Sequence, residues 1–188
     1  YYMVLSSFSY TPGLPILHST DLVNWQLVGH ALSRASQVDM SGMQVSRGIF
    51  APTIRYHDGT FYIITTVVDK GGNFILTATD PAGPWSDPIW LPEVEGIDPD
   101  MFFDDDGKVY ISHNGEAPDE ALYEGHRAIW MWQYDPVKKA VLPESKKLLV
   151  NGGVDLSTKP IWIEAPHIYK HNGWYYLVCA EGGTADQH

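Results

Sequence analysis

Two acidic residues have surroundings that suit acid–base chemistry. Asp98 lies in the stretch GIDPD (residues 96–100) and Glu164 in WIEAP (residues 162–166), each just before a hairpin-like pattern. If both hairpins begin on inner strands of one repeated unit, at the same place in the repeat, the carboxylates converge. Paired carboxylates hydrolyse glycosidic bonds, with one kept protonated near neutral pH by a raised pKa to donate its proton to the leaving oxygen.

Each carboxylate also has a purely structural explanation. An Asp before a proline often forms an Asx turn, and for Asp98 that alternative stays open. Glu164 has no turn to make, and burying an unpaired Glu is costly. The run Asp104–Asp105–Asp106 predicts a solvated hairpin turn.

Metal-ligating patterns are weak. An EF-hand loop with Gly107 at its sixth position would place Phe102 first and His113 twelfth, and neither suits calcium. His167 and His171 have ligand-like spacing but fall on a predicted strand and turn, so no metal site is predicted there.

The elements that must position the carboxylates are strands. One hairpin pattern occurs at residues 52–64, 101–111 and 166–177, with Asp-Gly or Asn-Gly turns of the kind that suit type I′ geometry. A second strand–turn–strand pattern alternates with it at residues 17–25 and 76–85, with a looser copy at 131–135. Four strands in roughly 50–60 residues is the spacing of propeller blades.

The fold prediction is therefore all-β: residues 1–188 form a single partial β-propeller domain of about three blades and part of a fourth. The third copy is longer, with an insertion around residues 116–126. Because propellers close with about 4–8 blades, we expect residues missing at both ends or a homo-oligomer formed through the open blade faces. The strand-like start at residues 1–4 is interpreted as a fragment boundary.

Composition excludes several partners. A net charge of −11 argues against nucleic acid and anionic lipid, and no apolar run is long enough to span a membrane. The aromatic content of 13% suits sugar-stacking platforms or sheet cores. The single cysteine, Cys179, permits no intrachain disulfide and is expected in the core. It does not decide between a cytoplasmic and a secreted bacterial protein.

The sequence resembles glycoside hydrolase family 43, in its β-xylosidase and α-L-arabinofuranosidase branch. The resemblance is carried by YYMVLSSF, STDLVNW, FAPTIRY, IDP, EAPH and AEGGT, which occur in that order at residues 1–8, 19–25, 50–56, 97–99, 164–167 and 180–184. Related invertase-like propellers usually have Arg before the middle Asp. Ile97 at that position favours family 43.

The resemblance implies a five-bladed propeller and an inverting mechanism with three acidic residues. Glu164 matches the general acid, and Asp98 matches the residue that orients the acid and tunes its pKa. The general base is normally an Asp shortly before the stretch matching residues 1–2, so we expect this chain to lack it. Phe50, Ile97 and His188 match positions near the sugar. No cofactor is required, although a structural calcium is compatible with the family.

The predicted function is hydrolysis of terminal arabinofuranosyl or xylosyl residues of hemicellulose. An alternative is a catalytically incomplete propeller fragment that binds sugar or self-associates. A protein-interaction propeller is a third alternative, and it leaves Asp98 and Glu164 unexplained. The choice between xylose and arabinose, and between exo and endo attack, stays open.

Overall fold

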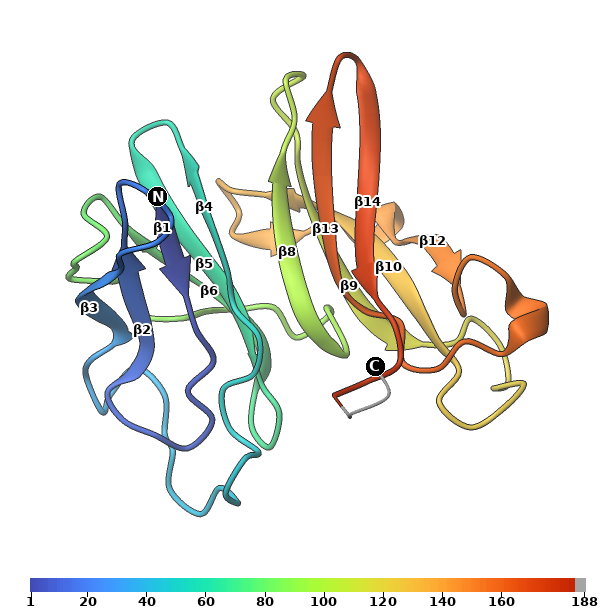
Figure 1. The fold of residues 1–188 in the computed structure, drawn as a ribbon, viewed down its shortest axis with the longest axis horizontal. Coiled ribbons are helices and arrows are strands. Elements are labelled where there is room, and N and C mark those ends of the chain that lie inside the picture. Colours follow the sequence, from blue (N-terminus) through green and yellow to red (C-terminus); the bar gives the residue numbers. More distant parts are fainter. Residues whose placement is uncertain (185–188) are drawn as a thin grey trace. The chain divides into compact units, whose positions relative to one another are not determined.

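The computed structural model describes residues 1–184. They form two compact units, which divide between Pro92 and Glu93. Strands joined by turns make up both, with two single-turn 3-10 helices in the second (Figure 1). The all-β prediction is confirmed. The expectation that residues 1–188 form one domain stays a prediction. None of the helices among the described residues has the length and hydropathy needed to cross a membrane.

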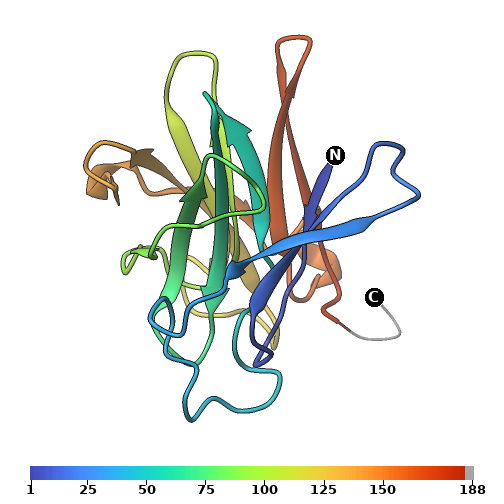
Figure 2. The ribbon, with the colours of Figure 1, turned by 90° about the vertical axis from the view of Figure 1, so that its left-hand side faces the viewer.

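The first unit contains two antiparallel sheets. One has the order β1–β2–β3 and the other β4–β5–β6–β7 (Figure 2). The strands are β1 (Tyr2–Val4), β2 (Gly13–His18), β3 (Gln26–Leu32), β4 (Thr53–His57), β5 (Thr60–Val67), β6 (Gly72–Ala78) and β7 (Ile89–Trp90). Each sheet is a meander in which sequential strands pair, as the repeated pattern predicts.

The core of the first unit contains side chains from both sheets. Leu14 and Ile16 of β2 and Ile63, Phe74 and Leu76 of β5 and β6 are all fully buried in one cluster. Residues two apart on a strand face the same side, which explains the spacing of 14 and 16 and of 74 and 76. Burying each such side chain stabilises the unit by about 1.5–3 kcal/mol.

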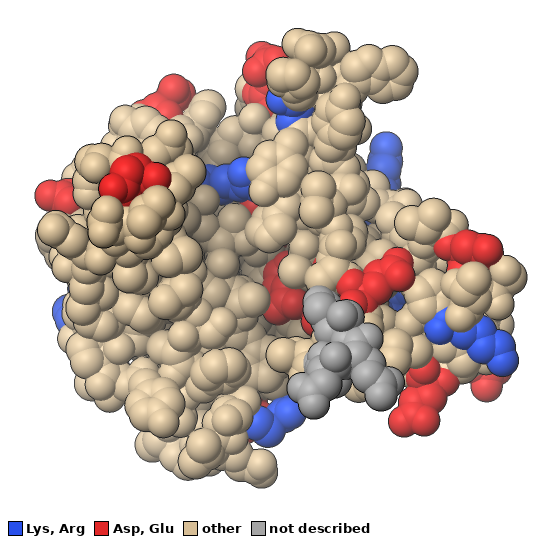
Figure 3. Space-filling view, viewed as in Figure 1, with Lys and Arg blue, Asp and Glu red and all other residues tan. Residues whose placement is uncertain are grey.

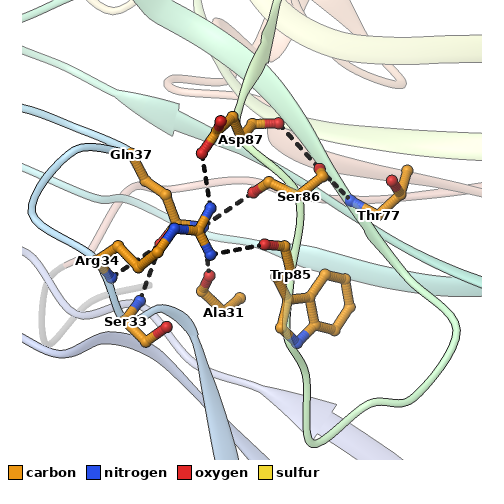
Figure 4. A network of polar contacts seen from close by, with 8 residues as sticks. All are labelled: Ala31, Ser33, Arg34, Gln37, Thr77, Trp85, Ser86 and Asp87. Carbon is orange, nitrogen blue, oxygen red and sulfur yellow. Dashed lines mark hydrogen bonds and ion pairs between the residues drawn. The ribbon is translucent and has the colours of Figure 1, made fainter.

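A buried glutamine fixes the loop after β3 to the connection after β6 (Figure 4). The Gln37 amide donates to the backbone oxygens of Ala31 (3.0 Å) and Ser86 (2.9 Å). Its carbonyl oxygen accepts from the backbone N–H of Ser33 and Arg34, both at 3.0 Å. Gln37 is only 4% exposed, so these bonds offset the cost of burying a polar group.

The second unit contains a larger sheet and a separate hairpin. The sheet has the order β11–β10–β9–β8, with β12 also pairing with β10, and the hairpin is β13–β14. The elements are β8 (Ile97–Phe103), β9 (Val109–Glu116), β10 (Arg127–Asp135), β11 (Ala140–Val141), η1 (Pro143–Ser145), β12 (Lys147–Asn151), η2 (Leu156–Thr158), β13 (Glu164–His171) and β14 (Trp174–Ala180).

Two of the three predicted hairpin turns have the expected geometry. Asp58–Gly59 and Asn172–Gly173 have positive φ at both residues, as a type I′ turn requires. The prediction is wrong for the turn between β8 and β9, where Gly107 has positive φ but Asp106 does not. Five residues connect these strands, and the backbone N–H of Asp104 bonds to the Lys108 carbonyl at 2.9 Å. The longer loop removes the need for two left-handed residues.

Asp104 is not the solvated turn residue that the sequence predicts. Its carboxylate accepts hydrogen bonds from Lys170 Nζ and Tyr175 Oη, both at 2.7 Å. The bond from Lys170, followed by that from Tyr175, lowers the pKa of Asp104 to about 2. Asp104 therefore links the β8–β9 turn to the β13–β14 hairpin.

The apolar run on β14 is more exposed than the sequence suggests. Trp174 (70%), Tyr176 (49%) and Val178 (54%) are accessible, and Cys179 is only partly buried. The expectation that Cys179 lies in the core is therefore wrong. β14 pairs only with β13 among the described residues, so no third strand covers its far side. Partial burial, followed by the charge of Glu181, raises the pKa of the thiol to about 11.

Candidate active site

Asp98 and Glu164 both lie at the start of a strand, as predicted, but not at equivalent positions. Each strand has a register shift beside a proline, between Ile97 and Asp100 in β8 and between Glu164 and His167 in β13. Asp98 (φ 54°) and Ala165 (φ 47°) precede these prolines and both have left-handed backbones.

When the two strands are aligned at their register shifts, Asp98 corresponds to Ala165, and Ile97 corresponds to Glu164. The prediction that the two carboxylates occupy the same place in the repeat is wrong by one residue. A bulge redirects the side chains beside it, and bulges are frequent next to active sites. A left-handed non-glycine residue before proline costs about 1–3 kcal/mol, so surrounding contacts must hold both conformations.

The two carboxyl groups are electrostatically coupled. Burial raises the pKa of Asp98 from 3.8 to about 6, and the negative charge of Glu164 adds to that rise. The backbone N–H of Ala165 donates to the Asp98 carboxylate, and the charge of His167 also favours ionisation, but both effects are smaller. The repulsion between the carboxylates is mutual, so the pair holds a proton more tightly than two isolated groups would.

A buried carboxylate joins β8 to β13 behind this pair. Asp100 is fully buried, and its Oδ2 accepts from the backbone N–H of Ile168 at 3.2 Å. His167 Nδ1 lies 3.5 Å from the same oxygen. Asp100 therefore fixes the strand that carries Glu164 against the strand that carries Asp98.

Two polar side chains of β9 add to this connection. Asn114 Nδ2 donates to the Ile163 carbonyl at 2.6 Å, and Ser112 Oγ donates to the Pro166 carbonyl at 3.4 Å. Both residues are buried. They bracket Glu164 by holding the backbone one residue before it and two residues after it.

The neighbouring histidine in β9 is neutral. Burial lowers the pKa of His113 to about 4. Its Nε2 accepts from Trp132 Nε1 at 3.1 Å, so its Nδ1 carries the proton and donates to the Asn114 carbonyl at 2.9 Å. His113 thus contributes packing and fixed hydrogen bonds to β9 and β10, without a positive charge.

The other predicted site residues lie in different parts of the chain. Ile97 is partly buried beside Asp98 and pairs with Asn114. Phe50 belongs to the first unit, where its partly buried ring lies 5.9 Å from the ring of Phe8. His188 lies outside the described residues.

Sequence reasoning missed the supporting residues Asp100, Ser112 and Asn114. A signal was present, because all three are polar residues within strand patterns, where a buried polar group needs a partner.

Within residues 1–184, no group of three or more His, Cys, Asp or Glu side chains is arranged to hold a metal ion. The face shown in Figure 3 carries few, separated Lys and Arg side chains.

Comparison with known proteins decides the family. The model of "Glycosyl hydrolases family 43" matches residues 1–188. The chain belongs to glycosyl hydrolase family 43. Hydrolases of this family need no cofactor.

Relatives of this chain are longer proteins. A "Xylosidase/arabinosidase" from Butyrivibrio fibrisolvens is 49% identical over 100% of this chain and 36% of its own length. The crystal structure of a "GH43_12" retrieved from a capybara gut metagenome has a TM-score of 0.94 at 52% identity, over 99% of this chain and 35% of that one. A xylan beta-1,4-xylosidase from Bacillus halodurans gives a TM-score of 0.85 at 38% identity, over 98% and 35%. The chain spans about a third of the length of these relatives. Its all-β fold is consistent with part of the propeller of this family.

Proposed function

We propose that this chain carries the acid-bearing part of a glycoside hydrolase that removes terminal arabinofuranosyl or xylosyl residues from hemicellulose with inversion. The observation that supports it most is the coupled pair Asp98 and Glu164, joined through the backbone N–H of Ala165. Relatives named xylosidase/arabinosidase and "Non-reducing end alpha-L-arabinofuranosidase" support the sugar class.

In this proposal Glu164 is the general acid. Its carboxyl proton moves to the glycosidic oxygen as the bond from that oxygen to the anomeric carbon breaks. Asp98 orients Glu164 and its negative charge favours the protonated acid. Phe50, Ile97 and His188 are proposed to contact the sugar.

A general base must remove a proton from the attacking water on the opposite face of the sugar. Inverting enzymes place this base about 6.5–9.5 Å from the acid, which leaves room for the water. Asp21 and Asp39 do not match the base motif, so we propose that the base comes from residues outside this chain.

The test is hydrolysis of nitrophenyl α-L-arabinofuranoside and nitrophenyl β-D-xyloside by the longest natural polypeptide that contains these residues. We expect nitrophenol release from at least one, and proton NMR of the first-formed sugar is expected to show the inverted anomer. The 188-residue segment alone should be at least about 10²-fold slower, because in this proposal the base lies outside it. If the long polypeptide hydrolyses neither substrate but binds the free sugar, the alternative of a sugar-binding protein replaces this proposal.

We further propose that the 188-residue segment, produced alone, associates with copies of itself. The β13–β14 hairpin exposes Tyr169 (47%), Trp174 (70%), Tyr176 (49%) and Val178 (54%) on one face, and unpaired strand edges and apolar faces favour association. Sedimentation velocity should show dimers or larger species at micromolar concentration. The variant Trp174→Ser with Tyr176→Ser should shift the distribution toward monomer, and a wild-type segment that stays monomeric at all concentrations contradicts the proposal.

A further inference from the structure

An exposed tryptophan with an unusual backbone lies two residues before Glu164. Trp162 has φ 59° and is 43% exposed. A bulky side chain in the left-handed region is strained, and such residues persist only where the surrounding structure holds them. Two residues of extended chain span about 7 Å, so the indole lies within the reach of a sugar ring bound at Glu164.

Two backbone hydrogen bonds hold this residue from opposite sides. The N–H of Trp162 donates to the Gly125 carbonyl, and the Ile161 carbonyl accepts from the Gly182 N–H, both at 2.8 Å. The indole lies directly on Gly125, since a Cβ there would be 2.6 Å from Trp162 Nε1. A Cβ on Gly183 would lie 3.6 Å from the Trp162 ring. The ring is therefore fixed in place while much of it stays accessible.

The segment that carries Gly125 is the insertion at residues 116–126, and it is firmly anchored. Tyr123 Oη donates to the Pro160 carbonyl at 2.7 Å, and its ring stacks on His126 at a centroid distance of 4.8 Å. His126 is 4% exposed, accepts from the Leu122 N–H at 3.2 Å, and therefore donates from Nε2 to Asn151 Oδ1 at 2.8 Å. The insertion thus supports the segment before Glu164 through contacts to Pro160 and Trp162.

Asp98 and Trp162 differ in burial and in where they meet the segment around Glu164. Asp98 is held by Ala165, the residue after Glu164, and is largely buried. Trp162 precedes Glu164 and faces solvent. In the proposed function the two carboxylates act on the bond to be cleaved, so we expect the sugar that is cleaved off on their buried side and the leaving group toward the exposed side.

We propose that Trp162 is a stacking platform for the first sugar ring of the leaving group, and so determines specificity for oligosaccharide over small leaving groups. The inference rests on the proposed function. The flat apolar face of an indole fits the C–H-bearing face of a pyranose ring, while the polar rim of the sugar stays in water.

The test compares two substrates of the same glycosyl group in the longest natural polypeptide that contains the chain. One is a xylo-oligosaccharide and the other a glycosyl fluoride, whose leaving group cannot stack. Trp162→Gly removes the indole and suits the left-handed backbone, so folding is retained. We expect kcat/KM to fall by about tenfold to a hundredfold on the oligosaccharide, mainly through KM, and by less than about threefold on the fluoride. Trp162→Phe should restore most of the loss, because it restores an aromatic face.

The possible failures are distinct. Equal losses on both substrates, or a loss that Phe does not restore, assign Trp162 a structural role and overturn this inference while leaving the proposed function intact. Absence of hydrolysis of either substrate by the unchanged protein overturns the proposed function and this inference with it. Circular dichroism and the melting temperature of each variant confirm that the fold is kept.

Discussion

Replacing Glu164 by Gln is expected to lower kcat on a xylo-oligosaccharide by about 10²–10⁴-fold. The amide has nearly the same shape as the carboxylic acid but cannot transfer a proton to the glycosidic oxygen. A glycosyl fluoride or a dinitrophenyl glycoside has a leaving group that departs without that proton. The loss on these substrates should therefore be small, less than about tenfold. The measurement is kcat for each substrate with the longest natural polypeptide.

The matched control is Glu144→Gln, which makes the same chemical change at an exposed position in η1. It should leave kcat on both substrates within about twofold, since surface substitutions away from a site have little effect. Equal losses of Glu164→Gln on good and poor leaving groups would remove the acid role from Glu164. Full activity on the oligosaccharide would do so as well.

The strand architecture follows from local rules, and the sequence therefore predicts it well. Period-2 patterns and Gly-containing turns define β4–β5 and β13–β14, because side-chain alternation and positive φ are properties of a few adjacent residues. The sequence did not predict the hydrogen-bonded position of Asp104, because its partners are the distant residues Lys170 and Tyr175. Such contacts join residues distant in sequence, and no local pattern records them.

The carboxylates Asp98 and Glu164 could be chosen from the sequence, but their spatial relation could not. The offset by one residue can be read from the two prolines, because Asp98 directly precedes its proline whereas Glu164 lies two residues before the other. The bulges that redirect both side chains depend on the pairing of each strand with its neighbour. The same holds for Trp162. Its exposed, left-handed conformation depends on Gly125 and Gly183, which lie on separate segments. Sequence reasoning identifies candidate groups, and the packing of β8, β9 and β13 decides which of them meet.

Replacing Asp98 by Asn is expected to reduce activity while increasing stability at neutral pH. The change removes the charge that orients Glu164 and favours its protonated form, and we expect kcat on an oligosaccharide to fall by about 10²-fold. Asn tolerates the left-handed backbone at φ 54°, and its side-chain oxygen can still accept from the Ala165 N–H. The backbone of the site should therefore be kept.

The stability gain should depend on pH in a defined direction. The folded-state pKa of Asp98 is about 6, above its ordinary value of 3.8. The native protein therefore binds this proton more tightly than the unfolded chain does. The stability that Asp98 contributes is fully present below pH 3.8 and is lost as the pH rises through 6. The shift corresponds to about 3 kcal/mol at most. Asp98→Asn should thus be more stable than the unchanged protein at pH 7, by up to that amount, and the advantage should disappear as the pH falls to about 4.

Urea unfolding of both proteins at pH 4, 5, 6 and 7 measures this difference. Asp119→Asn, at an exposed position in the 116–126 insertion, is the control and should show no pH-dependent difference. The opposite result is a variant whose stability, measured relative to the unchanged protein, falls as the pH rises from 4 to 7. That result would show that Asp98 is ionised and favourably bound in the fold. An ionised, well-satisfied Asp98 would be a structural residue. A buried charge that destabilises the fold at neutral pH is explained only by a function that needs it, and the combined loss of activity and gain of stability is the signature of that function.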